Sequence, residues 1–309
     1  MSEKMPTDPH IVSPAPLVTA VDRITIAVRD IDEAESIYMR LLGRHPSWRR
    51  TDRSGGTDHV HFDLDNISVE LVASIGPGVW GRQVQTFLER RGEGMLALFL
   101  RTDDAVATAR GLTERGLNTI AMPEGEGIGL DGSRRRWRNT MMPREASRNM
   151  TVIACEHIAG IDETWPSPVC AGVARDTVIS AMDHVVVMTS DGDACKKLFG
   201  EQFGIRLALD HSKPEWGVRQ LFFRLGGVTI EIVEPLDKTK TPSSDFLWGV
   251  AWKTADIRAT RERLVAEGAD VTEVARGRKK DTEVATIRPP TCGIPTLLIG
   301  TVTTNERSK

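Results

Sequence analysis

Residues 182–204 read MDHVVVMTSDGDACKKLFGEQFG, and residues 21–43 read VDRITIAVRDIDEAESIYMRLLG. Each stretch has an alternating apolar segment, typical of a strand, then an acidic turn, apolar residues at helical spacing and a final glycine that can end a helix. A shift of 161 residues superimposes the two stretches. The same shift places DNISVELVAS (65–74) on GGVTIEIVEP (226–235) without a gap. A repeat of this kind indicates a fold built by duplication.

Each half continues with a second unit of the same kind. LALFLRTDDAVATARGLTERGL (96–117) and VAWKTADIRATRERLVAEGA (250–269) align with a shift of 152 residues. Both patterns predict a strand, an acidic turn and a helix that ends at a glycine, and further strand-like segments follow in each half. The chain therefore consists of four strand–helix–strand units, grouped two by two. Pro166, Pro168 and Gly172 interrupt both periodicities between the two groups.

The composition is that of a globular protein with about two domains. The 309 residues are 40% hydrophobic and 27% charged, with a formal net charge of −3, which argues against a disordered or nucleic-acid-binding protein. We expect residues 1–17 to be a loose leader rather than a signal peptide, and no segment is long and apolar enough for a membrane span. Four widely spaced cysteines without a CxxC pair fit a reducing cytoplasm. We therefore expect a cytoplasmic protein with neither a nucleic-acid nor a membrane partner.

The four motifs in this order resemble the vicinal oxygen chelate superfamily, which contains glyoxalases, bleomycin-resistance proteins and extradiol dioxygenases. The resemblance rests on the two stretches quoted first, on RRGEGMLALFLRTDDAVATARGL (90–112) and on GGVTIEIVEP, and it covers about residues 19–302. It implies an α+β fold of tandem βαβββ modules that form two glyoxalase-like domains with curved, cup-shaped mixed sheets. Each cup would hold a small molecule, often with a divalent metal at its floor. The expected organisation is a leader (1–17), an N-terminal domain (18–160), a linker (161–178), a C-terminal domain (179–303) and a tail (304–309), with two modules in each domain.

Strand alternation predicts which side chains face each cup. In the C-terminal half, polar groups and apolar walls share one face, a composition typical of small-molecule pockets. This face contains His184, Met188, Gln220, Phe222, Arg224 and Glu231, and Trp216 lies on a neighbouring loop where a ring can cover a cup. The corresponding N-terminal face is too polar for a core, and it collects Arg23, His59, His61 and Glu70.

His184 and Glu231 are the preferred functional pair. They match the first and second metal-ligand positions that the resemblance implies, and histidine and glutamate bind iron, manganese, nickel or zinc. The two remaining ligand positions align with Gly249 and with Leu297 or its neighbour, and neither Gly249 nor Leu297 has a metal-binding side chain. Three interpretations stay open. His184 is a hydrogen-bonded imidazole in a mixed pocket, and Glu231 forms an ion pair with Arg224 without chemistry. Alternatively, the pair binds a divalent metal completed by substrate oxygens and water, or it works without metal as a general acid and base. In the last two cases Gln220 and Arg224 would bind substrate, with Phe222 and Met188 as walls.

The N-terminal face is a secondary candidate site. Two histidines and a carboxylate, His59, His61 and Glu70, form a ligand set that suits iron, manganese or zinc, although not at the usual positions of the family. Arg23 beside them would repel a cation, and it pairs more naturally with Glu70 or with a substrate carboxylate. The four family positions in this half are Arg23, Glu70, Ala97 and Thr151 or Val152, of which only Glu70 is a good ligand.

These observations favour an enzyme that acts on a small aromatic or carboxylated metabolite. Isomerase, lyase and ring-cleaving dioxygenase chemistry all fit an enolate-like intermediate held in such a cup. The alternative is a metal-free protein that binds and sequesters a small molecule, as bleomycin-resistance proteins do. Exposed sheet edges in such modules favour a homodimer.

Overall fold

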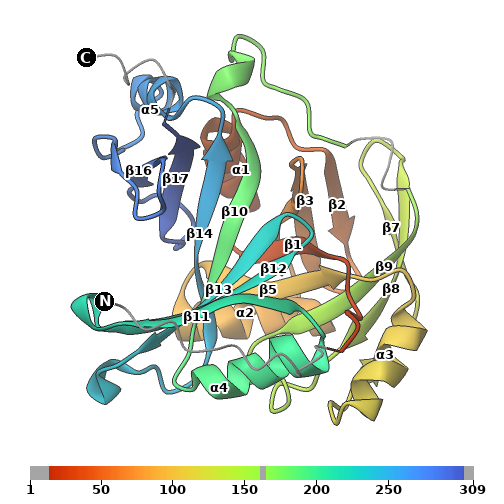
Figure 1. The fold of residues 1–309 in the computed structure, drawn as a ribbon. Coiled ribbons are helices and arrows are strands. Elements are labelled where there is room, and N and C mark those ends of the chain that lie inside the picture. Colours follow the sequence, from red (N-terminus) through yellow and green to blue (C-terminus); the bar gives the residue numbers. More distant parts are fainter. Residues whose placement is uncertain (1–13, 161–164, 303–309) are drawn as a thin grey trace.

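The computed structural model describes residues 14–160 and 165–302. The predicted tail, and the parts of the predicted leader and linker at residues 1–13 and 161–164, lie outside these ranges. Two mixed sheets form the body of the molecule, and most of the helices lie at its periphery (Figure 1). Among the described residues, no helix combines the length and the apolar character that crossing a membrane requires.

The first sheet contains the strands of residues 20–159. Its elements are β1 (Ala20–Ala27), α1 (Ile31–Leu42), β2 (Trp48–Asp52), β3 (Thr57–Asp63), β4 (Ser68–Ser74), α2 (Val79–Arg91), β5 (Gly94–Arg101), α3 (Ala105–Glu114), β6 (Ile120–Ala121), β7 (Gly125–Ile128), β8 (Arg134–Met141) and β9 (Val152–Ala159). The strand order is β2-β3-β4-β1-β5-β9-β8-β6, and β7 pairs with β8.

The second sheet contains the strands of residues 179–301. After the turn η2 (Arg175–Thr177) come β10 (Ile179–Met188), α4 (Gly192–Cys195), the π-helix η3 (Lys196–Gln202), β11 (Arg206–Lys213), η4 (Pro214–Trp216), β12 (Val218–Leu225), β13 (Val228–Pro235), η5 (Lys238–Lys240), β14 (Phe246–Thr254), α5 (Ile257–Ala266), β15 (Ala275–Arg276), β16 (Thr282–Ile287) and β17 (Thr296–Thr301). The strand order is β11-β12-β13-β10-β14-β17-β16-β15.

The two halves share one topology. In each, the first strand of one module pairs in parallel with the last strand of that module and antiparallel with the first strand of the next module. The registers agree as well, because Arg23 lies opposite Ser68 and His184 lies opposite Thr229. The predicted duplication and the α+β fold of tandem βαβββ modules are therefore confirmed.

An aspartate begins the helix of every module. Asp30, Asp104, Asp191 and Asp256 are the N-caps of α1, α3, α4 and α5, and each side chain accepts hydrogen bonds from backbone N–H groups of the first turn. These are the acidic turns of the repeat. A cap of this kind contributes about 0.5–2 kcal/mol and fixes where the strand ends and the helix begins.

The helix-covered faces of both sheets form one continuous core. Alternation sends Ile24 and Ile26 into it from β1, and Val185 and Val187 enter it from β10. The opposite faces of these strands, which carry Thr25 and His184, line the two cups.

The two cups differ by one helix. In the first half α2 packs Val84 and Leu88 against Ala27 and Val72, which share the cup face with Thr25 and Glu70. Figure 1 shows α2 near the middle of the molecule, whereas α3, α4 and α5 lie at its edge. Between β13 and β14, the described chain of the second half has only the short turn η5. One end of the N-terminal cup is therefore filled by its own chain.

Candidate functional site

The predicted pair of the C-terminal half is brought together on adjacent strands. His184 of β10 and Glu231 of β13 approach to 3.4 Å between Nε2 and Oε2. The other ring nitrogen of His184, Nδ1, lies 3.0 Å from Oδ2 of Asp183. The imidazole therefore lies between two carboxylates, an arrangement that holds the ring in place.

Sequence reasoning missed Asp183, because alternation places it on the opposite face from His184. The pairing of β10 with β14 shifts register between Met182 and His184. A β-bulge re-aims the side chain at the irregularity, and here it lets Asp183 reach the ring of its neighbour. The same irregularity recurs 161 residues earlier, between Val21 and Arg23, where Asp22 contacts Arg23. In the sequence, Asp183 aligns with Asp22 at the 161-residue shift, so a comparison of the two halves could have pointed to it.

A chain of polar groups extends from Glu231 along the cup. Gln220 donates through Nε2 to Oε1 of Glu231 at 2.6 Å, and both residues are buried. His211 of β11 is opposite Gln220 in the register, and its Nε2 lies 3.4 Å from the side-chain oxygen Oε1 of Gln220. His211 was not predicted, because β11 alternates too weakly to reveal a cup face. These contacts fix the orientation of the Glu231 carboxylate.

Cations surround Asp183. Lys253 places Nζ 3.6 Å from Oδ1 of Asp183. Burial raises the pKa of Asp183, but the hydrogen bond with His184 and the positive charges of His184, Lys253 and Lys279 outweigh it and lower the pKa to about 2. Asp183 therefore stays ionised throughout the physiological range.

The remaining predicted residues of this half lie around the pair. Phe222 is opposite Glu231 in the register, and both Phe222 and Met188 are half-buried. Arg224 is exposed and donates to Thr229 Oγ1 at 2.6 Å.

Trp216 is 39% exposed, and the guanidinium of Arg278 lies 4.1 Å from its ring centroid. Trp216 ends η4, which follows the edge strand β11, and Arg278 follows the opposite edge strand β15. Their contact brings the two edges of the curved sheet together.

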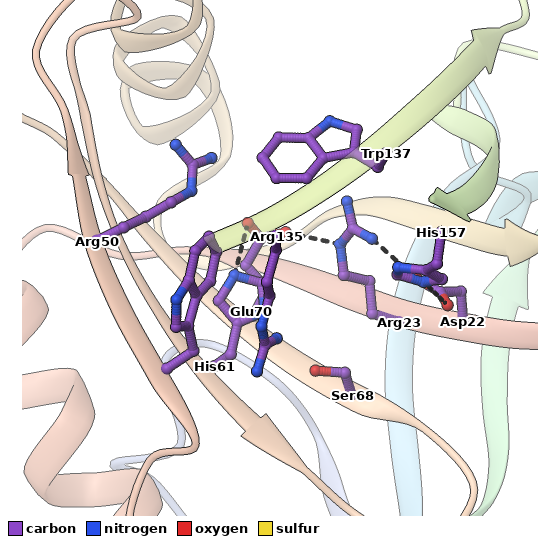
Figure 2. A pocket seen from close by; sticks show the side chains of 10 residues that line it. Asp22, Arg23, Arg50, His61, Ser68, Glu70, Arg135, Trp137 and His157 are labelled. Carbon is purple, nitrogen blue, oxygen red and sulfur yellow. Dashed lines mark hydrogen bonds and ion pairs between the residues drawn. The ribbon is translucent and has the colours of Figure 1, made fainter. Parts of the chain in front are cut away.

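The N-terminal candidates converge on one carboxylate, and Figure 2 shows Arg23 and His61 beside Glu70. Oε2 of Glu70 accepts from Arg23 Nε at 3.1 Å and from Thr25 at 2.6 Å. Oε1 of Glu70 lies 2.8 Å from His59 Nδ1 and 3.4 Å from His61 Nε2. Burial raises the pKa of Glu70, but the charge of Arg23 and the contacts of both histidines hold it well below its usual range.

Two residue trios in this half have the donor types of a metal site, namely His59, His61 and Glu70, and Asp22, Cys155 and His157. Arg23 contacts the carboxylates of both, through Glu70 and through Asp22 at 2.8 Å. Burial raises the pKa of Cys155 to about 11, so the thiol keeps its proton. A guanidinium therefore already neutralises the carboxylates that a cation would need, and the trios do not fit a divalent metal in this arrangement.

The C-terminal pair supplies two ligand atoms. The sheet register places Gly249 opposite Val186 and Leu297 opposite Ala251. These are the two family ligand positions at which this chain has no metal-binding side chain. In the first half the equivalent of Leu297 is Ile153, opposite Phe99, rather than Thr151 or Val152, because the strand phase shifts by one residue before β9. Zinc sites of known type have three or four protein ligands, so the described residues do not complete one.

Family comparisons agree with this architecture. A family profile described as "Glyoxalase-like domain" matches residues 21–172, and a second, described as "Glyoxalase/Bleomycin resistance protein/Dioxygenase superfamily", matches residues 183–286. The chain belongs to the vicinal oxygen chelate superfamily. Both halves of this vicinal oxygen chelate protein carry the family domain, as the repeat predicts.

Known structures share the fold at low sequence identity. A mutant of 4-hydroxymandelate synthase from Streptomyces coelicolor has a TM-score of 0.67 and 15% identity, with 93% of each chain covered. A Mn(II)-bound glyoxalase from Novosphingobium aromaticivorans has a TM-score of 0.60 and 14% identity, over 93% of this chain and 84% of the other. In sequence, an ethylmalonyl-CoA/methylmalonyl-CoA epimerase of Cereibacter sphaeroides is 26% identical over 102 residues, 30% of this chain and 75% of that protein.

Proposed function

We propose that the C-terminal cup is the active site of an enzyme that removes and returns a proton beside the carbonyl of a small carboxylated metabolite. The observation that carries the proposal is the position of the His184 imidazole between Asp183 and Glu231 on a cup face. An imidazole oriented by carboxylates on both sides is a side chain of the type that acts as a general base. The sequence similarity to an epimerase is compatible with this chemistry, since epimerisation proceeds by loss and return of such a proton.

Positive charge around the pair supports an anionic substrate. Lys253 contacts Asp183, and the charge of Lys279 also acts on that carboxylate. Arg224 is exposed on the strand next to Glu231. A carboxylate, and the enolate that forms when the proton leaves, would both be stabilised by these cations.

Each protein group has a role in the proposed step. Asp183 bonds Nδ1 of His184 and so leaves Nε2 as the atom that takes the substrate proton. Glu231, held by Gln220, then stabilises the imidazolium at 3.4 Å. Phe222, opposite Glu231 in the register, is a half-buried apolar wall of the cup, which lowers the local dielectric and strengthens both contacts, and Met188 lies further along the His184 strand.

Hydrogen exchange tests the proposal directly. The full chain is incubated in D₂O with pyruvate, phenylpyruvate or methylmalonate, and loss of the exchangeable proton is followed by NMR. We expect exchange above the buffer rate for at least one probe, and a loss of about 10²–10⁴-fold in His184→Gln. His45→Gln, which alters an exposed histidine, is the matched control. Equal exchange by wild type and His184→Gln would show that another group moves the proton.

A second candidate is a metal-free protein that sequesters a small molecule. Gly249 and Leu297 favour it, because both family ligand positions that they occupy lack a metal-binding side chain. Metal analysis of protein purified without chelator separates the candidates. Stoichiometric iron, manganese, nickel or zinc that disappears in His184→Ala supports a metalloenzyme. Metal that stays in His184→Ala but leaves in His61→Ala would place the site in the N-terminal half.

We also propose that the chain forms a homodimer, which light scattering on the purified protein would test. We further expect no nucleic-acid partner.

A further inference from the structure

The N-terminal half contains a small cavity away from the proposed active site. It lies between the cup face of β1, β3 and β4 and the side chains of β2 and β8 that cross over it (Figure 2). Its volume is about 40 Å³, and Trp48 and Trp137 form its aromatic walls. At roughly 10–15 Å³ for each water, this space holds about three non-hydrogen atoms.

Two buried polar atoms at this cavity have no hydrogen-bond partner among the described residues. They are Nε2 of His61 and Nε of Arg50. His61 is only 7% exposed, and its Nε2 is 3.4 Å from Glu70 without the alignment of a hydrogen bond. An unsatisfied buried donor costs about 1–3 kcal/mol, so each such atom calls for a missing partner.

The carboxylates near the cavity are already engaged. Glu70 is held by Arg23, Thr25 and His59. Asp22 is held by Arg23, by Arg101 at 3.0 Å and by His157 at 2.6 Å.

Among the described residues, no carboxylate forms a comparably short ion pair with Arg50. Its nearest ion-pair contact is Asp52 at 3.7 Å, and its guanidinium lies 5.7 Å from the ring centroid of Trp48 and 5.5 Å from that of Trp137. Burial lowers the pKa of Arg50, and the charge of Arg23 lowers it further, although Glu70 and Asp52 act in the opposite direction. Arg135 also lines the cavity, and its Nη2 lies 3.3 Å from Oδ2 of Asp63. Arg50 is therefore the lining arginine with the longest ion pair, and two indole rings lie near its guanidinium.

We propose that this cavity binds a small oxyanion of carboxylate type, held by the Arg50 guanidinium and by the N–H of His61. The planar fork of a guanidinium matches the two oxygens of a carboxylate. The volume admits an anion of the size of formate, and the tautomer of His61 with its proton on Nε2 completes the donor set. The anion is either a free one-carbon acid or the carboxylate end of a longer metabolite.

Thermal unfolding of the full chain tests the site, with sodium formate, acetate, benzoate and chloride at equal ionic strength and sodium gluconate as the reference salt. Formate is expected to raise the Tm in a saturable way, because a ligand that binds only the folded state stabilises it by mass action. Arg50→Gln and His61→Asn should weaken formate binding at least tenfold. Arg53→Gln, which alters an exposed arginine on the same hairpin, should leave binding unchanged.

The results distinguish a free small acid from the end of a longer metabolite, and this cavity from the proposed active site. Formate alone indicates a free small acid, and a larger shift with benzoate indicates the end of a longer metabolite. An equal shift with chloride, or no shift with any salt, overturns the proposal, because the cavity then holds a halide or water. If Arg50→Gln does not fold, line broadening of ¹³C-formate by wild type and by His61→Asn gives the same comparison. His184→Gln should bind formate as wild type does, which separates this site from the proposed active site.

Discussion

One residue position separates the chemistry of the two cups. Asp22 and Asp183 occupy equivalent bulges, and the next residue is Arg23 in one half and His184 in the other. Arginine keeps its charge at all relevant pH values, so Arg23 permanently neutralises Asp22 and Glu70. A histidine can act as a general acid or base, which a permanently charged arginine cannot. The proposed proton transfer is therefore assigned to the C-terminal cup.

His59 makes a specific prediction about acid stability. Burial lowers its pKa from 6.5 to about 4, Arg50 adds to the effect, and the contact with Glu70 opposes it. Between these two pH values the unfolded chain binds a proton that the folded chain does not, so stability falls as the pH drops from about 6.5 to about 4. We expect this histidine alone to cost about 2 kcal/mol between pH 7.5 and pH 5.

Urea unfolding at the two pH values measures this cost. The loss of stability on acidification should be about 2 kcal/mol smaller in His59→Gln than in wild type. His45→Gln should lose as much as wild type, because His45 is exposed. An identical pH dependence in wild type and His59→Gln would show that His59 is protonated in the folded state.

At the scale of elements, α2 is what makes the two cups unequal. Its buried face covers Ala27 and Val72 at one end of the N-terminal cup, and the second half has only η5 in the same place. Val84 is 2% exposed and Val79, on the same helix, is 58% exposed. Replacing a buried valine by alanine loses the transfer free energy of two methyl groups and leaves a cavity.

Val84→Ala should therefore lower the free energy of unfolding by about 1.5–3 kcal/mol in urea denaturation. Val79→Ala is a matched control, because it makes the same side-chain change on the same helix without removing buried contacts. We expect it to fall within about 0.5 kcal/mol of wild type. Equal effects of the two variants would mean that α2 does not fill the cup in solution.

The sequence was sufficient for the fold and for part of the site. Strand and helix periodicity, repeated at fixed shifts, predicted the paired modules, and strand phase predicted that His184 and Glu231 lie together. It did not predict Asp183, because a bulge breaks alternation, nor the role of α2, because a helix pattern does not say which face of a sheet it covers. Contacts between distant hairpins, such as Trp216 with Arg278, have no local pattern at all.

At the scale of the whole molecule, the two halves share one core and are joined by an ion pair whose carboxylate is buried. The apolar cluster runs through both sheets. Arg148, in the loop before β9, donates through Nε and Nη2 to the carboxylate of Asp245, just before β14. Asp245 is 1% exposed and also accepts from the Cys195 thiol at 3.3 Å. Removing one partner of such a pair leaves a buried charge uncompensated, which costs about 3–5 kcal/mol.

Arg148→Met should accordingly destabilise the chain by about 3–5 kcal/mol, and Arg148→Met with Asp245→Asn should recover part of that loss because no charge is then left unpaired. Arg144→Met, which changes an exposed arginine of the same loop, should have little effect. Because the core is continuous, we expect fluorescence and circular dichroism to report one cooperative unfolding transition in every variant. Two transitions in Arg148→Met, with the C-terminal half unfolding separately, would instead mean that the halves are independent domains and that the ion pair, rather than the shared core, couples them.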